Sequence, residues 1–361
     1  MSHVAFYITG HGFGHATRMI AVAGAMTALA PDVQLTFITT VPESLFRLNL
    51  SGPFRLRPRA LDVGVIQHDS LRLDPAATLA AYARLMDRQP ATLEEEARFL
   101  RREGVDLVVA DIPPAAFPVA QRAELPGVGI SNFSWDWIYA EYVRELPGYT
   151  PLLEAIRDAY ARADLFLRLP FHGGCDAYKR IRDIPMIARR SRQSREEIRG
   201  LLGLNGSRPV ILLSFGGFEV HGIDFDRVEA LQDYCFLVTQ PPPRPIRNVQ
   251  VVRLGAIKYE DLVAQADAVI TKPGYGIVSD CLANRTPVLY TSRGQFAEYQ
   301  CLVEGLERFG VSAFIENRDL LAGNWRGSLE ALLRQPRAWA ELPTNGAEVA
   351  ADLLRAFLPH G

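Results

Sequence analysis

Two histidines and three glycines lie close together near the start of the chain, in the stretch ITGHGFGHATR. An apolar run, VAFYIT (4–9), leads into them and predicts a buried strand. Glycines in the turn after a strand let a ligand approach the backbone, and the next helix directs its N-terminal amides at an anion. His15 would begin that helix, where the helix dipole disfavours imidazolium and leaves the ring able to accept a proton. The stretch predicts a general base beside an anion that is bound at Gly12 and Gly14. A histidine that caps or packs a tight turn is the alternative.

Asp111 is the candidate partner of that base. It ends the strand-like run DLVVAD (106–111), and Pro113 and Pro114 prevent the strand from continuing. If this strand lies beside the first one, the carboxylate can hydrogen-bond the imidazole and raise its basicity, as in many acid–base sites. An aspartate that caps the following helix is the alternative interpretation.

Two loops in the second half of the chain have the composition of phosphate-binding turns. The first is LLSFGGFE, in which Ser214, Gly216 and Gly217 directly follow an apolar run. Backbone amides in such a turn can face a diphosphate. A bulged turn is the alternative for the two glycines.

The second loop is TKPGYGIVSD. Lys272 can neutralise the charge of a phosphate there, and helical spacing places Gly274, Tyr275 and Gly276 at the entry of the next helix. Asp280 lies about one turn further along, where a carboxylate can accept hydrogen bonds from both hydroxyls of a ribose. A solvated helix face is the alternative for Asp280. Two such loops on strands of one half predict a nucleotide site.

Two further segments supply candidates for binding sugar hydroxyls. Glu298, in SRGQFAEYQ, follows the strand-like run PVLYT and either binds the donor sugar or begins a helix. Asn132, Trp135 and Asp136, in the aromatic segment SNFSWDWIYAEYV, follow another strand end and are predicted to line an acceptor pocket, because flat sugar faces stack on aromatic rings. A core helix is the alternative for this segment. We assign His11 to the same acceptor-binding group.

Composition and motifs exclude several classes of protein. A net charge of −2 gives no electrostatic reason to expect nucleic acid or an anionic membrane as partner. The four cysteines are widely spaced without a CxxC pair or a histidine cluster, which argues against a structural zinc site and a disulfide scaffold. The first glycine-rich turn does not have the spacing G-x-G-x-x-G, so a nicotinamide dinucleotide is poorly supported. The chain lacks a signal peptide and a long apolar run, so we expect a cytoplasmic protein.

The elements that must position these residues alternate between short apolar runs and longer helical segments. This alternation is typical of parallel sheets with helical crossovers, and it restarts in the second half of the chain. At 361 residues, two domains are expected. We predict an α/β protein with a Rossmann-like domain over residues 1–188, a second over 189–340, and a helix over 341–361 that crosses back to the first. The stretch of residues 75–102 is predicted to be helical.

Taken together, these motifs resemble those of GT-B glycosyltransferases, in which two Rossmann-like domains face each other across a cleft. The segments ITGHGFGHATR, NFSWDWIYAEYV and GYGIVSDCL are similar, in this order, to those of the amino-terminal domain of plant L-arabinokinases and its stand-alone bacterial relatives. The resemblance implies that His15 is the catalytic base and Asp111 its supporting acid. It further implies that Lys272 meets the diphosphate, Asp280 the ribose and Glu298 the donor sugar.

The function that follows is an inverting, metal-independent glycosyl transfer from a nucleoside diphosphate sugar, with uridine as the expected base, to a hydroxyl acceptor. No cofactor is expected beyond this donor, and the protein is expected to be a monomer or homodimer. A non-hydrolysing sugar-nucleotide 2-epimerase and a non-catalytic sugar-nucleotide sensor are the alternatives. The chain has no glycine- and serine-rich kinase phosphate loop, so the resemblance does not imply arabinose kinase activity.

Overall fold

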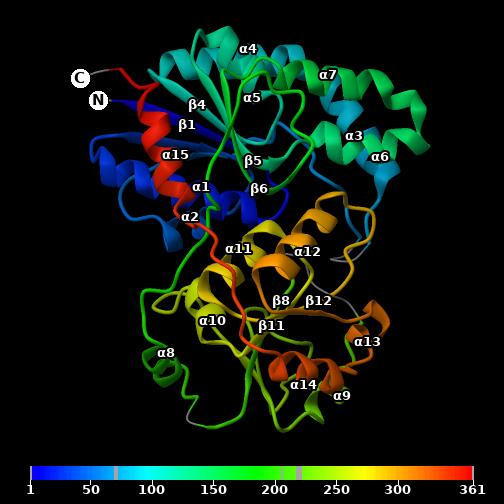
Figure 1. Cartoon of the computed structure of the whole chain (residues 1–361). Helices are drawn as coiled ribbons and strands as arrows, with labels where there is room; N and C mark the ends of the chain where they lie inside the picture. The colour runs from blue at the N-terminus through cyan, green and yellow to red at the C-terminus, as the bar shows by residue number, and fades with distance from the viewer. Residues whose placement is uncertain (1, 69–71, 205, 217–221, 360–361) are drawn as a thin grey trace.

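Two parallel β-sheets, one above the other in Figure 1, form the framework of the molecule. The computed structural model describes residues 2–68, 72–204, 206–216 and 222–359. The first sheet has the order β3-β2-β1-β4-β5-β6-β7. Its strands are β1 (His3–Ile8), β2 (Gln34–Ile38), β3 (Arg55–Arg57), β4 (Leu107–Asp111), β5 (Gly127–Phe133), β6 (Leu165–Gly173) and β7 (Ile181–Asp183).

The second sheet has the order β10-β9-β8-β11-β12-β13. Its strands are β8 (Val210–Ser214), β9 (Cys235–Val238), β10 (Val249–Val251), β11 (Ala268–Thr271), β12 (Val288–Tyr290) and β13 (Ser312–Phe314). In both sheets the strand order reverses beside a central strand, β1 or β8, and this is where open α/β sheets bind ligands.

Helices cover both faces of the first sheet, because its strands are apolar on both sides. One face carries α1 (Phe13–Leu29), α2 (Glu43–Asn49) and α15 (Gly346–Arg355). The other carries α3 (Pro75–Asp87), α4 (Gln89–Arg102), α5 (Ala116–Ala123), α6 (Trp135–Glu145) and α7 (Thr150–Tyr160). The stretch 75–102 is thus two helices, with the break at Arg88.

The second sheet is covered in the same way. One face carries α8 (Arg195–Leu201), α10 (Tyr259–Gln265), α11 (Tyr275–Asn284) and α12 (Glu298–Phe309). The other carries α9 (Phe225–Glu229), α13 (Asn317–Leu321) and α14 (Arg326–Arg334). The buried cluster beneath α1 continues into that beneath α11 and α12, so the two halves share one apolar core. The predicted α/β class with parallel sheets is confirmed.

The chain passes between the two sheets twice, and the two passages lie side by side. Ile187 pairs with Asn345 in an antiparallel bridge, and the amide of Gly346 donates to the carbonyl of Met186 at 3.0 Å. After the second passage, α15 packs against α1, which brings both ends of the chain to the same side of the first sheet (Figure 1).

Strand register decides which loops meet. Ile8 of β1 pairs with Asp111 of β4, so the glycine-rich turn after β1 and the predicted acid lie at one edge of the first sheet. Ser214 of β8 pairs with Thr271 of β11, so the two predicted phosphate loops lie at one edge of the second. Because α1 packs against α11, and α12 against β6, these two edges face each other.

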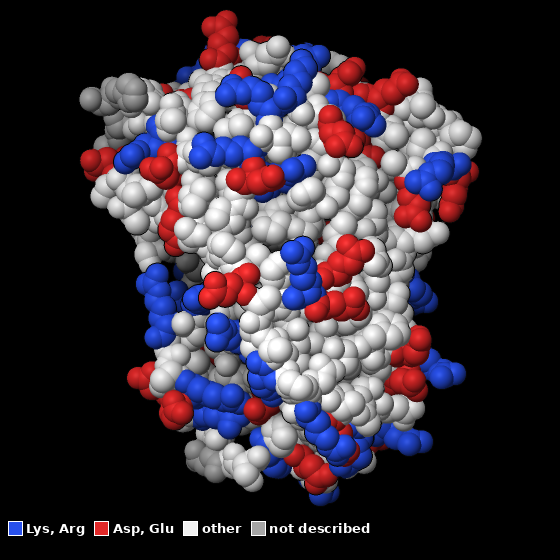
Figure 2. Space-filling model, in the orientation of Figure 1, with Lys and Arg blue, Asp and Glu red and all other residues white. Residues whose placement is uncertain are grey.

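Basic and acidic side chains are interspersed on the face of the molecule shown in Figure 2, without a large area of either sign. This distribution agrees with the net charge of −2. Among the residues that the structure describes, no helix has both the length and the apolar composition needed to cross a membrane.

Candidate active site

A cavity of about 290 Å³ lies between the facing edges of the two sheets. Residues from both halves of the chain line it. Of the residues predicted from the sequence, the cavity brings together His11, Gly12, Gly14, His15, Ser214, Gly216, Lys272, Gly274, Tyr275, Gly276 and Glu298. Gly217 lies outside the described residues.

His15 and Asp111 are hydrogen-bonded on the first-sheet side of this cavity. The Nδ1 atom of His15 lies 2.9 Å from Oδ1 of Asp111. Asp111 is fully buried behind the ring, while His15 itself lines the cavity. The edge of the imidazole rests against Phe133, with ring centroids 5.6 Å apart. A histidine held this way by a buried carboxylate has the base–orienter geometry of acid–base catalysis.

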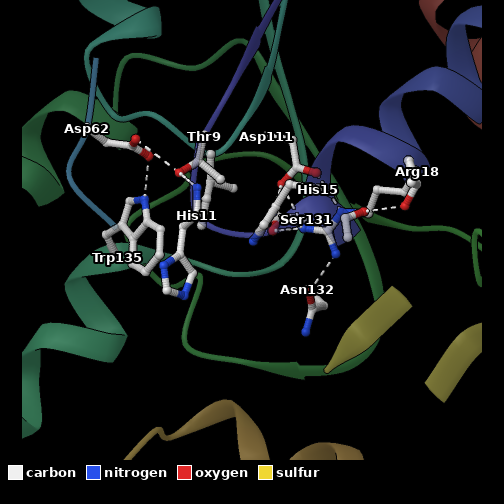
Figure 3. A network of polar contacts seen from close by, with 12 residues as sticks. Thr9, His11, His15, Arg18, Asp62, Asp111, Ser131, Asn132 and Trp135 are labelled. Atoms are coloured by element: carbon white, nitrogen blue, oxygen red, sulfur yellow. Dashed lines mark hydrogen bonds and ion pairs between the residues drawn. The ribbon is translucent and has the colours of Figure 1, made fainter. Parts of the chain in front are cut away.

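Arg18, one turn along α1 from His15, holds the carboxylate from its other side (Figure 3). Its Nε donates to Oδ2 of Asp111 at 2.5 Å, and its Nη2 donates to Oδ1 at 2.7 Å. Nη2 also donates to Oγ of Ser131 at 2.8 Å. Burial disfavours the charged form of Asp111, but Arg18 and His15 together hold the pKa of its carboxyl below the ordinary value of 3.8.

Two groups compete for Nδ1 of His15. It lies 2.9 Å from both Oδ1 of Asp111 and Nη2 of Arg18, so it donates to the carboxylate in one tautomer and accepts from the guanidinium in the other. Asp111 and Ser131 also accept from Nη2, which has two hydrogens. In the tautomer in which Nδ1 donates to Asp111, Nε2 has a lone pair, as a general base requires.

The first turns of α1 and α11 meet in the middle of the cavity. Gly12 begins α1 with φ of 80°, a conformation that favours glycine, and neither it nor Gly274 supplies a side-chain cap. The helix starts are in contact: a Cβ on Gly276 would lie 3.2 Å from Cα of Gly14, so a side chain there would crowd the opposite backbone. Two uncapped helix N-termini that point at one space form an anion site, and Lys272 lines the same space.

Arg18, Arg189, Lys272 and Arg293 line the cavity, and Glu298 is the one carboxylate among the described lining residues. Each of the three arginines forms an ion pair with a buried carboxylate, with Asp111, Asp280 and Glu298 respectively. The case for an anionic ligand therefore depends mainly on the partial positive charge of the two helix starts and on the presence of Lys272 beside them.

The two ends of the cavity differ in chemistry. At one end, the β2–α2 region contributes Leu45, Leu48 and Asn49, and the loops after β9 and β10 contribute Gln240 and Leu254. These apolar and amide side chains suit a flat, neutral group. The other end, where β6 approaches α12, holds His15, Arg293 and Glu298, whereas Arg189 stacks on Tyr259 of α10.

Glu298 lies at that charged end and is held by both halves of the molecule. Its Oε1 accepts a hydrogen bond from Nδ2 of Asn132 at 2.8 Å, and its Oε2 accepts one from Nη1 of Arg293 at 2.9 Å. The guanidinium of Arg293 stacks on the ring of Phe296, 3.8 Å from its centroid. Burial lowers the pKa of Arg293, and Glu298 opposes that shift.

His11 is neutral and has a fixed tautomer. The backbone amide of Val65 donates to its Nδ1 at 3.2 Å, so its own hydrogen is on Nε2. Burial, and then the charges of Arg293, His15 and Lys272, lower its pKa well below the ordinary value. His11 lines the same cavity as His15, with its ring against Trp135 and Phe296.

A buried aspartate supports the loop that carries His11 (Figure 3). Asp62 accepts hydrogen bonds from Oγ1 of Thr9 at 3.0 Å and from Nε1 of Trp135 at 2.8 Å. Thr9 in turn accepts from the backbone amide of His11. Burial raises the pKa of Asp62 to about 6, against the opposing effect of these two hydrogen bonds.

The structure places Asp280 behind the cavity wall. Its carboxylate is buried and accepts hydrogen bonds from the backbone amide, Nε and Nη2 of Arg189, at 3.0, 3.1 and 2.5 Å. Asp280 is not among the residues that line the cavity, whereas Arg189 is. The carboxylate fixes the segment between the two sheets to α11, and its contact with a ribose stays a prediction.

The predicted acceptor residues Asn132, Trp135 and Asp136 do not line this cavity, and all three are buried. Asn132 is bonded within the protein on both sides, Trp135 donates to Asp62, and Asp136 lies 3.9 Å from Arg157. Their role toward an acceptor stays a prediction.

Sequence reasoning missed four charged residues of the site and its surroundings. Arg18 had a usable signal, since it follows His15 by three residues on a helix and therefore lies on the same face. Arg293 lies in the loop that was singled out for Glu298. Arg189 and Asp62 have no local motif, and only the folded chain brings them to the site.

Comparisons with known proteins agree with this architecture. No protein-family model matches the chain. The chain is 32% identical over 356 residues to L-arabinokinase of Arabidopsis thaliana, in a match that covers 97% of this chain and 34% of that protein. The chain thus spans about a third of the length of this relative.

Three solved structures share the fold at low sequence identity. The glycotransferase of kitacinnamycin has 17% identity and a TM-score of 0.64, with 99% of both chains covered. UGT2 of Phytolacca americana, solved with UDP-2fluoro-glucose and pterostilbene, has 11% identity and a TM-score of 0.61, with 99% and 94% covered. MurG of Acinetobacter baumannii has 13% identity and a TM-score of 0.56, with 99% and 100% covered. Each likeness extends over both sheets.

Proposed function

We propose that this chain, which has the GT-B fold of these glycosyltransferases, transfers a sugar from a uridine diphosphate sugar to a hydroxyl group, with inversion at the anomeric carbon. One observation carries the proposal. His15, whose Nδ1 contacts the buried Asp111, shares a cavity with the two uncapped helix starts and Lys272. One wall thus offers a base for a hydroxyl, and the centre offers positive charge for a diphosphate.

In the proposed reaction, the acceptor hydroxyl attacks the anomeric carbon while His15 takes its proton on Nε2. The bond between that carbon and the diphosphate oxygen breaks, and the electron pair leaves with the diphosphate. Asp111 stabilises the imidazolium that forms. Lys272 and the amides around Gly274 and Gly276 stabilise the departing anion. Attack from the face opposite the leaving group inverts the anomeric configuration.

The proposed donor lies along the cavity in a defined direction. Its diphosphate occupies the meeting point of α1 and α11, and its base lies among Leu45, Leu48 and Gln240 at the neutral end. Its sugar lies at the end with His15 and Glu298. A uridine donor is supported by the structurally similar Phytolacca enzyme, which was solved with UDP-2fluoro-glucose. Metal independence is part of the proposal, since Lys272 and the helix starts supply the positive charge that a metal would otherwise provide.

Nucleotide binding tests the donor assignment. We expect UDP to raise the thermal unfolding temperature, because a ligand at 100 times its Kd stabilises the native state by about 2.7 kcal/mol. Lys272→Ala should weaken UDP binding roughly 10–100-fold, since a hydrogen bond to a charged group is lost. The exposed Lys179→Ala is the matched control and should bind UDP like the unaltered protein. A response to ATP or to dinucleotides but not to UDP would contradict the assignment.

A further inference from the structure

Asn132 joins the candidate catalytic pair to the opposite half of the molecule. It lies in β5, is fully buried, and has both ends of its amide in use. Nη1 of Arg18 donates to its Oδ1 at 2.8 Å, and its Nδ2 donates to Oε1 of Glu298 at 2.8 Å. A guanidinium can only donate and a carboxylate can only accept, so one orientation of the amide satisfies both partners.

The result is a continuous chain of polar contacts across the cavity. It runs from His15 through Asp111 and Arg18 to Asn132, and continues to Glu298 at the start of α12. Figure 3 shows the first-sheet part of this chain, with Asn132 at its end. All of these side chains are at least nine-tenths buried, so each bond is formed with little competition from water.

The position of Arg18 bears on the tautomer of His15. Nη2 of Arg18 lies 2.9 Å from Nδ1 of His15 and also contacts Oδ1 of Asp111 and Oγ of Ser131, so three acceptors compete for its two hydrogens. When Asp111 and Ser131 take both hydrogens, Nδ1 keeps its own proton and donates it to Asp111. When the guanidinium directs a hydrogen at Nδ1, the proton of His15 is on Nε2, and the base is lost.

We propose that Asn132 is a positioning residue that holds Arg18 so that His15 keeps its proton on Nδ1, and that it does so only while Glu298 is docked against it. The base would thus be complete only when the second half of the molecule closes on the first. The role in turnover rests on the proposed function. The tautomer of His15 does not, since it is a property of the ligand-free protein.

The test swaps the donor and the acceptor in the hydrogen bond between residues 132 and 298. Asn132→Asp sets a second carboxylate against Glu298, which breaks the link, and its charge draws the guanidinium of Arg18 away from its place beside Ser131 and Asp111. Glu298→Gln, added to it, supplies an amide that can donate to the new carboxylate and still accept from Arg293, at unchanged total charge. The matched control is Tyr142→Phe, which removes a different hydrogen bond between the halves, from Tyr142 to the carbonyl of Gln295.

The first readout is the ¹⁵N NMR spectrum of the His15 ring without ligand. We expect the proton on Nδ1 in the unaltered protein and in Tyr142→Phe, a shift of protonation toward Nε2 in Asn132→Asp, and its return to Nδ1 in the double variant. An unchanged tautomer in Asn132→Asp would overturn the proposal. So would a double variant that does not recover.

The second readout is release of UDP from the UDP-sugar that stabilises the protein most. Misplacement of a catalytic group lowers the rate of the chemical step by a factor on the order of 10–100. We therefore expect kcat to fall by that factor in Asn132→Asp, with little change in the Kd for UDP. The double variant is judged by its NMR spectrum alone, because Glu298 lines the cavity where the donor sugar is proposed to lie. Equal kcat in Asn132→Asp and the unaltered protein would overturn the proposal. If no UDP-sugar is turned over by the unaltered protein, the proposed function fails, and the NMR result still decides the role of Asn132.

Discussion

His15→Ala is expected to lower turnover of the donor by about 10²–10⁴-fold, the usual contribution of general base catalysis. In the proposed mechanism the Nε2 lone pair is the acceptor for the proton of the attacking hydroxyl. Alanine leaves that proton without a positioned acceptor. The helix starts and Lys272 remain, so the affinity for UDP should stay close to that of the unaltered protein.

Steady-state release of UDP and calorimetric binding of UDP, measured on the same preparations, separate these two effects. His172→Ala is the matched control, because His172 is exposed and is not among the residues that line the cavity. It should turn over donor at the unaltered rate. Full activity in His15→Ala would exclude His15 as the base, and loss of UDP binding in that variant would mean that the ring acts mainly in binding.

Arg18→Met is expected to lower the free energy of unfolding by about 3–5 kcal/mol at pH 7. Arg18 and Asp111 are both almost completely buried and share two hydrogen bonds. Methionine has a similar volume but no charge, so Asp111 would remain ionised in the core without its partner. Removal of one member of a buried ion pair lowers the free energy of unfolding by more than the intact pair adds to it. The remaining charge is then buried without either its partner or water.

The loss of stability in Arg18→Met should become smaller as the pH falls. The pKa of Asp111 is below 3.8 in the folded protein, so its ionised form contributes stability above about pH 4 and loses that contribution as the pH falls through the folded pKa. Without Arg18 the carboxyl takes up a proton more readily, so the difference between the two proteins should narrow in acid. Urea denaturation of both proteins at several pH values measures this difference in the free energy of unfolding.

Arg47→Met is the matched control, because it breaks the exposed ion pair with Glu43. It should change the free energy of unfolding by less than about 0.5 kcal/mol. A penalty for Arg18→Met as small as that would contradict the account of the buried network.

The sheets could be predicted from the sequence because their central strands are continuous apolar runs. The strands β1, β4, β8 and β11 are buried on both faces, and each is followed by a turn rich in glycine or proline. The edge strands β3, β7 and β13 have three residues each, too few to show a period, and they form only because a neighbouring strand offers its hydrogen bonds. The break at Arg88 between α3 and α4 was also missed.

The rule that ligands lie beyond the carboxyl ends of strands brought His15, Lys272 and Glu298 to one cavity without structural information. It also placed Asp111 behind His15. The rule says nothing about which way a polar side chain turns, so it did not predict that the carboxylate of Asp280 is bonded to Arg189 behind the cavity wall. A buried polar group must find a partner, but the partner is set by tertiary packing and leaves no local pattern in the sequence.

The likeness to L-arabinokinase and to the solved glycosyltransferases confirms the resemblance read from the sequence motifs. The chain corresponds to about a third of the plant protein's length, so the sugar kinase activity that its name indicates is not part of our proposal. What this chain shares with the glycosyltransferases is the fold.

Product analysis tests the central claim most directly. The protein is incubated with the UDP-sugar that stabilises it most, with a panel of hydroxyl acceptors, and with EDTA present throughout. The account predicts equal amounts of UDP and of a glycoside whose anomeric configuration is opposite to that of the donor. A donor sugar that is converted to its epimer without any acceptor, or a glycoside of retained configuration, would contradict it.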